Sequence, residues 1–189
     1  MKRFAVLTFV LLFAACGRGE TRQGVTNISG VMPNLQFAMT RANDGAAVTA
    51  DSYRGKVVIL YFGYTHCPDE CPTTLANLAN VLKTLGPAAN NVRVLFVTVD
   101  PARDTLAALK SYTNAFASQI DGLRGTDNAI AMLARRYRAL YSVTQTDRGV
   151  EVMHSGSVFL FDPRGRAREV LTDTNNETAM ANDIAALMH

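Results

Sequence analysis

The chain has 189 residues, of which 48% are hydrophobic and 19% are charged, and its formal net charge at pH 7 is +3. This length and composition suit one globular domain with a full core, and they argue against both a membrane-embedded protein and a disordered chain. The sequence also lacks the basic runs and aromatic platforms that track a phosphate backbone, so no nucleic-acid partner is expected.

The first fifteen residues have the pattern of an export signal. Met1-Lys2-Arg3 is a charged start, and the apolar residues 4–13 are too few to span a bilayer, which needs about 20. Ala14 and Ala15 then place two small side chains before Cys16, which resembles a bacterial lipoprotein signal. We therefore predict a lipoprotein-type signal peptide over 1–15 and a lipidated Cys16 that anchors an extracytoplasmic domain to a membrane, on the periplasmic face in a Gram-negative cell. The alternative is ordinary secretion, with Cys16 removed or left spare.

A polar segment separates this signal from the expected domain. Residues 16–30 are rich in Gly, Thr, Arg, Asn and Ser and have little apolar periodicity, so we predict a flexible tether. The folded domain is then expected over 31–189. Its first element should be a hairpin, because residues 35–39 and 46–50 flank Asp44-Gly45, a strong turn signal.

The stretch from residue 56 to residue 85 organises the rest of the domain. Residues 56–62 form a continuous apolar, β-branched and aromatic run, typical of a strand that is covered on both faces. A helix is predicted next from a leucine stripe at Leu75, Leu78, Leu82 and Leu85. Cys67 and Cys71 therefore lie at a helix N-terminus beyond the carboxyl end of a central strand. Ligands of open α/β sheets gather at such a position, and the helix dipole there favours thiolate over thiol.

The spacing of the two cysteines allows two uses. In a helical turn, residues four apart share one face, and their Cα atoms lie about 6 Å apart. A disulfide can bridge that distance, and the same two sulfurs can clamp one soft metal ion. A bridge that closes so short a loop removes little chain entropy. A purely structural disulfide is therefore the weaker interpretation, and we predict a working pair.

The remaining elements complete an α/β domain. Residues 92–99 form a second buried strand, and the order strand, helix, strand predicts a βαβ unit with parallel strands. Amphipathic helices are expected over 105–116, capped by Asp104, and over 128–138. A protruding hairpin is expected from 141–146 and 150–154, a second one from 157–161 and 167–171, and a closing helix from about Asn176. This is the order of a thioredoxin-like fold with a central mixed sheet, flanking helices and an added β-hairpin.

Three motifs narrow the comparison. They are Tyr61-Phe62-Gly63-Tyr64-Thr65-His66-Cys67-Pro68-Asp69-Glu70-Cys71-Pro72-Thr73-Thr74, Thr98-Val99-Asp100-Pro101-Ala102-Arg103-Asp104-Thr105, and His154-Ser155 ahead of Asp162-Pro163-Arg164-Gly165. In order, spacing and chemistry they resemble the Sco/SenC family of copper chaperones for cytochrome c oxidase assembly, over roughly 31–189. The resemblance implies one copper ion bound by Cys67, Cys71 and His154, and its delivery to cytochrome c oxidase subunit II or another cuproprotein.

One residue departs from the family pattern, and two others are candidates for an outer role at the site. The family commonly has Asp just before the histidine, whereas this chain has Met153, so a carboxylate that orients His154 is either absent or supplied elsewhere.

His66 is a candidate fourth ligand or outer neighbour of the site. Asp100 ends a strand and could orient a ligand, or it could simply cap the turn before Pro101.

The donor chemistry is consistent with copper. Two thiolates and one imidazole make a soft, low-coordinate site that holds Cu(I) and admits Cu(II) through its nitrogen ligand. Zinc is the obvious competitor. A closed structural zinc site needs four protein ligands, however, and the sequence offers no second cysteine pair.

A thiol–disulfide oxidoreductase is the rival function, because a dithiol at a helix N-terminus on this fold has the necessary parts. Such a protein would reduce the cysteines of the recipient copper site or of other exported proteins, and it would need a thiol reductant as a partner. C-x-x-C is the commoner redox spacing, which weakens this alternative and leaves a metallochaperone, rather than an enzyme, as the main prediction. A passive binding domain is a third alternative, and a copper titration would separate it from the other two.

Overall fold

The computed structural model of the chain describes residues 24–147 and 149–188, so the predicted signal peptide over 1–15 and Cys16 lie outside the described residues. The main strands are β1 (Val25–Asn27), β2 (Ala38–Arg41), β3 (Ala47–Thr49), β4 (Val57–Gly63), β5 (Val92–Thr98), β6 (Ile120–Arg124), β9 (Val158–Phe161) and β10 (Ala167–Leu171). The helices are α1 (Glu70–Leu85), α2 (Leu106–Asn114), α3 (Asp127–Tyr137) and α4 (Glu177–Ala186), with short 3₁₀ turns η1 (Ala50–Tyr53) and η2 (Gly86–Asn91). A hairpin of β7 (Tyr141–Thr146) and β8 (Gly149–His154) stands apart from the main sheet.

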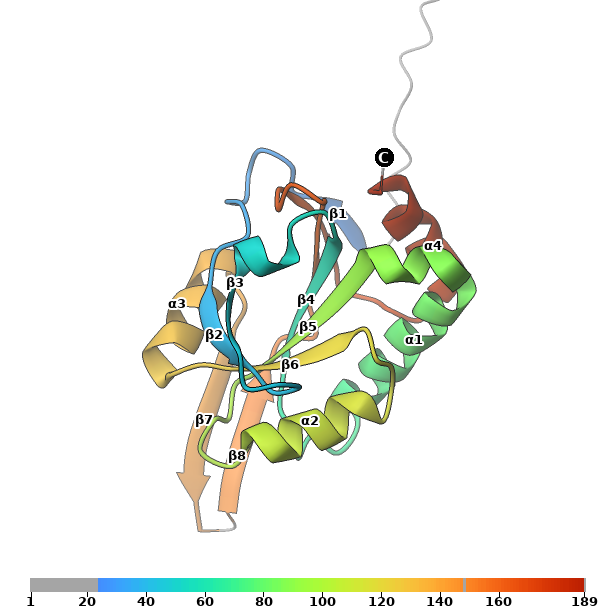
Figure 1. Ribbon diagram of the computed structural model, residues 1–189. Helices are drawn as coiled ribbons and strands as arrows, with labels where there is room; N and C mark the ends of the chain where they lie inside the picture. Colours follow the sequence, from blue (N-terminus) through green and yellow to red (C-terminus); the bar gives the residue numbers. More distant parts are fainter. Residues whose placement is uncertain (1–23, 148, 189) are drawn as a thin grey trace, which may run out of the picture.

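The main sheet is mixed, and β4 lies near its middle. Its strand order is β1-β10-β9-β4-β5-β6-β2-β3 (Figure 1). β4 pairs in parallel with β5 and antiparallel with β9. Every residue of β4 is buried, as its continuous apolar run predicts for a strand covered on both faces. The α/β, thioredoxin-like architecture is therefore confirmed.

Helices cover both faces of this sheet. Leu75, Leu78 and Leu82 of α1 are buried, as their helical spacing predicts, and α4 packs against the same helix. On the opposite face, the ring of Tyr137 in α3 packs edge-on against Phe161 of β9, with ring centres 5.2 Å apart. Figure 1 shows α3 on one side of the sheet and α1 and α4 on the other. β4 is consequently covered from both faces.

Two boundaries differ from the sequence-based prediction. β1 falls inside the segment 16–30 that was predicted to be a tether, and Val25 pairs with Leu171 of β10. The described fold therefore begins before Val31. β1 has only three residues, and its partial exposure gives no alternation that a sequence pattern could reveal. At α2 the capping residue is Thr105, whose hydroxyl accepts from the N–H of Ala108 at 3.1 Å, and not the predicted Asp104.

The predicted protruding hairpin is present as a separate two-stranded sheet. Among the strands that the structure describes, β7 and β8 pair only with each other, and Figure 1 shows them extending away from the main sheet. Tyr141 lies opposite His154 at the base of the hairpin, where the N–H of Ser155 donates to the carbonyl oxygen of Leu140 at 2.8 Å. The hairpin thus carries His154 back toward the main sheet. Over the described part of the chain, none of the helices combines the length and apolar character that crossing a membrane requires.

Candidate metal centre

The two cysteines lie on either side of the start of α1. The chain leaves β4 at Gly63, and Cys67 lies in the loop before the helix, while Cys71 lies in its first turn. Cys67 is therefore outside the helical turn that the sequence predicted for both residues. Its sulfur accepts a hydrogen bond from the N–H of Cys71 at 3.3 Å. Because the first N–H groups of a helix have no partner within the helix, this contact fixes the position of the Cys67 sulfur.

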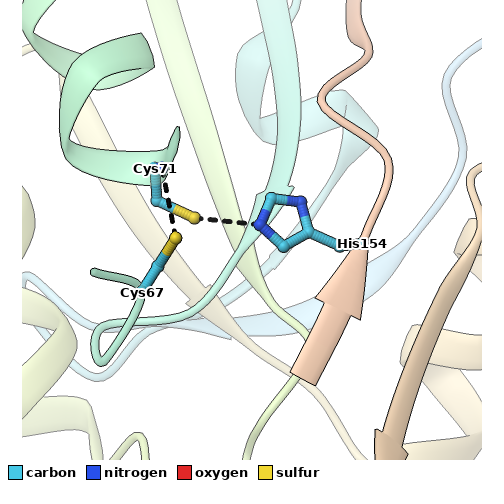
Figure 2. A group of neighbouring side chains, drawn as sticks. All are labelled: Cys67, Cys71 and His154. Atoms are coloured by element: carbon cyan, nitrogen blue, oxygen red, sulfur yellow. Dashed lines mark hydrogen bonds between the residues drawn. The ribbon is translucent and has the colours of Figure 1, made fainter. Parts of the chain in front are cut away.

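His154 approaches the same sulfur pair from the end of β8. Its Nε2 atom lies 3.1 Å from the Sγ atom of Cys71. The two sulfurs and one ring nitrogen of the histidine all lie within 4.8 Å of one another (Figure 2). The fold therefore brings together the three residues that the sequence resemblance singled out, from a loop, a helix and a hairpin.

The two sulfurs differ in exposure. Cys71 is fully buried at 0% relative exposure, whereas Cys67 is partly exposed, and both are free thiols. Burial raises the pKa of Cys71 to about 12, and a hydrogen bond from the backbone of Tyr64 opposes that rise. At this residue desolvation outweighs the stabilisation of thiolate that the helix N-terminus was expected to give. A metal ion that binds Cys71 at neutral pH therefore has to displace its proton.

The ring of His154 is held with Nε2 toward the sulfurs. Its Nδ1 atom lies 3.2 Å from the carbonyl oxygen of Ser155, which can only accept, so Nδ1 is the donor in this contact and Nε2 is the nitrogen that faces the sulfurs. Ring edges of Tyr61 and Tyr64 pack against the imidazole, with centroids 6.0 and 5.9 Å away. The carbonyl oxygen of Ser155 thus orients the ring of His154, as a carboxylate would if this chain had Asp in place of Met153. Met153 itself is 72% exposed and, as the neighbouring strand residue, points to the other face of the hairpin.

Asp104 is a site neighbour that the sequence did not reveal. It is fully buried, and its carboxylate accepts hydrogen bonds from the N–H and hydroxyl of Thr65 at 3.0 and 2.6 Å and from the hydroxyl of Thr98 at 2.6 Å. These bonds tie the cysteine loop to the end of β5. The neighbouring Thr105 is an equally good capping residue, so the sequence carried no signal that Asp104 turns inward instead.

Replacing Asp104 with Asn is expected to destabilise the reduced protein. An amide keeps the size of the side chain but presents an N–H₂ group where one carboxylate oxygen now accepts, so at least one buried donor of Thr65 or Thr98 loses its partner. Such a loss costs about 1–3 kcal/mol, which thermal or urea unfolding would measure. Asp147→Asn, at an exposed position in the hairpin turn, is the matched control and should leave stability unchanged. Equal stability of both variants would contradict the assigned role of Asp104.

Asp100 and His66, the two predicted outer residues, lie differently. The buried carboxylate of Asp100 forms an ion pair with Arg103, whose guanidinium lies 6.0 Å from the ring centre of Tyr64. Asp100 is therefore connected to the site indirectly: it pairs with Arg103, and Arg103 lies near Tyr64, which packs on His154. The side chain of His66 is 54% exposed, and its Nδ1 atom lies 3.1 Å from the Thr65 hydroxyl and 3.5 Å from Asp104. His66 therefore contacts Thr65 and Asp104, which tie the cysteine loop to β5, rather than the three converging donors.

Comparison with known proteins places this arrangement in a family. The family model described as SCO1/SenC matches residues 33–189. The SCO2 homolog of Bos taurus, a mitochondrial protein, is 40% identical over 135 residues, which is 65% of this chain and 51% of the relative. The mitochondrial SCO1 homolog of Mus musculus is 35% identical over 156 residues, 80% of this chain and 55% of the relative. The chain thus spans about half the length of these curated relatives.

Solved structures agree with the sequence comparison. The copper-bound structure of Bradyrhizobium japonicum ScoI superposes with a TM-score of 0.75 at 35% identity, covering 82% of this chain and 98% of that one. The copper-bound structure of yeast Sco1 gives a TM-score of 0.73 at 31% identity, covering 82% of this chain and 87% of that one. With a family model that matches most of its length and with these structural relatives, the chain belongs to the SCO1/SenC family.

Proposed function

We propose that this protein is a copper chaperone that binds one copper ion through Cys67, Cys71 and His154. The observation that carries the proposal is the convergence of two sulfurs and one imidazole nitrogen within 4.8 Å of one another. Thiolates favour Cu(I), and the imidazole also suits Cu(II). Relatives at 35% and 31% identity have been solved with copper bound, which supports the same cargo here.

The recipient we propose is cytochrome c oxidase, at the binuclear copper site of subunit II, or another cuproprotein with thiolate and imidazole ligands. The support is that the chain belongs to the SCO1/SenC family. Its sequence resemblance to the Sco/SenC copper chaperones implies a part in assembly of that oxidase. The partly exposed Cys67 and His154 give an incoming ligand access to the ion, whereas Cys71 is shielded. A thiol reductant that keeps both cysteines reduced is the second partner we propose.

Metal loading of the purified, reduced protein tests the copper proposal. Under anaerobic conditions and with excess Cu(I), one copper per chain should remain after desalting, and X-ray absorption should show sulfur and nitrogen neighbours. A parallel loading with Zn(II) is the control for metal identity, because a three-donor site lacks the fourth ligand of a closed zinc site. A protein that retains no copper, or copper without sulfur neighbours, would refute the proposal.

Thiol–disulfide exchange is the second candidate function. Its specific support is the contact of the Cys71 N–H with the Cys67 sulfur, which keeps two free thiols side by side at a helix N-terminus. In this alternative Cys67, the more exposed sulfur, would attack the substrate disulfide, and Cys71 would resolve the mixed disulfide. Reduction of a cuproprotein's oxidised cysteines, without copper retention, would favour it.

We further propose that the mature protein is extracytoplasmic and is anchored by a lipid on Cys16. The support is the short apolar run followed by Ala14-Ala15-Cys16. The wild-type protein should partition with membranes and carry a diacylated Cys16 by mass spectrometry, while Cys16→Ala should leave the membrane fraction. A wild-type protein that is wholly soluble after lysis, with an unmodified Cys16, would refute the anchor.

A further inference from the structure

The hydroxyl of Tyr61 is buried without a partner beside the candidate metal centre. Tyr61 is 0% exposed, and its hydroxyl oxygen makes no hydrogen bond to the residues that the structure describes. Leaving a buried polar group unpaired costs about 1–3 kcal/mol, so native proteins rarely do it without a reason. Tyr61 lies in the middle of the most buried strand, where a phenylalanine would fill the same space. The hydroxyl therefore points to an acceptor that another state of the site provides.

The position of Tyr61 identifies that partner. Tyr61 and Gly63 lie two residues apart on β4, so their side-chain directions share one face of the sheet. A Cβ atom at Gly63 would lie only 2.8 Å from the Sγ atom of Cys71, which shows that this sulfur rests on the same face. The Tyr61 ring also packs edge-on against His154, whose Nε2 contacts that sulfur. Tyr61 is thus next to two of the three converging residues.

The side chains beside this hydroxyl come from the start of α1. The hydroxyl lies near the side chains of Thr74 and Cys71 but has hydrogen-bonding geometry with neither. A protonated thiol is a poor acceptor, whereas a metal-bound thiolate is anionic and accepts more strongly. The acceptor for the phenol is therefore created when a metal replaces the thiol proton.

We propose that the Tyr61 hydroxyl donates a hydrogen bond to the Cys71 sulfur in the copper-bound protein and thereby favours Cu(I) over Cu(II). The inference rests on the proposed function, in which Cys71 is a copper ligand. Hydrogen bonds to a ligating sulfur withdraw electron density from it, and such bonds tune the redox potential of copper–thiolate sites. Tyr61 is then a positioning and tuning residue, which never ligates the ion itself.

Tyr61→Phe tests the proposal by removing only the hydroxyl. In the Cu(II) form of the variant, the sulfur-to-copper charge-transfer band should move to longer wavelength, and the Cu(II)/Cu(I) potential should fall. Copper stoichiometry should remain that of the wild type. Tyr137→Phe is the matched control, because it removes another buried phenol, one that donates to the carbonyl of Asn34 at 2.9 Å on the opposite face of the sheet. The control should shift neither the band nor the potential.

The outcomes separate this inference from the proposed function. A Tyr61→Phe variant that holds copper with an unchanged band and potential would overturn the hydrogen bond but leave the copper site standing. Failure of the wild type itself to retain copper would overturn the proposed function. If the variant does not fold, proton NMR of the wild type decides. Loading with Cu(I) should produce a slowly exchanging Tyr61 hydroxyl proton with an Overhauser contact to the β-protons of Cys71, and absence of this signal would overturn the inference.

Discussion

Replacement of Cys71 with serine is expected to abolish retention of Cu(I) by the reduced protein. Cys71 is the fully buried sulfur and lies 3.1 Å from the Nε2 atom of His154, so it is central to the donor set. A serine hydroxyl is a hard donor that stays protonated at neutral pH, and it leaves only one thiolate for a soft ion. Copper and protein would be measured after desalting against a Cu(I) chelator. Cys67→Ser should give the same loss.

The histidine variants sharpen this prediction. His154→Ala leaves both sulfurs, so it should weaken retention of Cu(II) more than that of Cu(I), because the nitrogen ligand is the one that suits Cu(II). His66→Ala is the matched control, since the side chain of His66 is 54% exposed and contacts Thr65 rather than the three donors. Wild-type stoichiometry in Cys71→Ser would show that the ion is held elsewhere.

Oxidation is expected to have an effect of similar size. A disulfide between Cys67 and Cys71 would remove both thiolates as donors, and His154 alone cannot hold the ion tightly. Pre-oxidised protein should therefore take up only a small fraction of the copper that reduced protein takes up, and reduction should restore uptake. Peptide mapping would confirm that the bridge joins Cys67 to Cys71 and does not involve Cys16.

Thiol alkylation gives an independent measurement of the same competition. In the metal-free reduced protein, Cys67 should react well before Cys71, because Cys71 is buried and its raised pKa keeps it protonated. Copper loading should protect both. If oxidised and reduced proteins bind copper equally well, the sulfurs are not the ligands, and thiol–disulfide exchange becomes the better account of the pair.

Much of the fold could be predicted because its signals are local. The continuous apolar run of β4 predicts a strand buried on both faces, the leucine stripe of α1 predicts a helix buried along one face, and Asp44-Gly45 marks a turn by its backbone preferences. β6 escaped prediction for the opposite reason. Its Asp121 is a poor strand residue on its own, and it is accommodated by distant partners, the hydroxyl of Tyr53, which donates to it at 3.0 Å from 68 positions away, and the guanidinium of Arg41, 3.9 Å away.

Some residues of the candidate site also have a local sequence signal, and others have none. Cys67 and Cys71 stand out from their spacing and their place between a strand and a helix. His154 has no local signal, and only the family resemblance connected it to the cysteines. Asp104 and Tyr61 were missed because a buried carboxylate and an unpaired hydroxyl become visible only when their surroundings are known. Long-range contacts of single side chains are what sequence periodicity cannot report.

The placement of His154 on a separate two-stranded sheet would also make a bound ion a structural link. Cys71 and His154 are 83 positions apart, and in the metal-free protein a single sulfur–nitrogen contact joins them. A covalent bridge of similar span restricts the unfolded chain by about 4–5 kcal/mol, and a coordinated ion acts in the same sense. Copper would thus be cargo and cross-link at once. Loading should slow amide exchange in β7 and β8, and delivery of the ion would free the hairpin again.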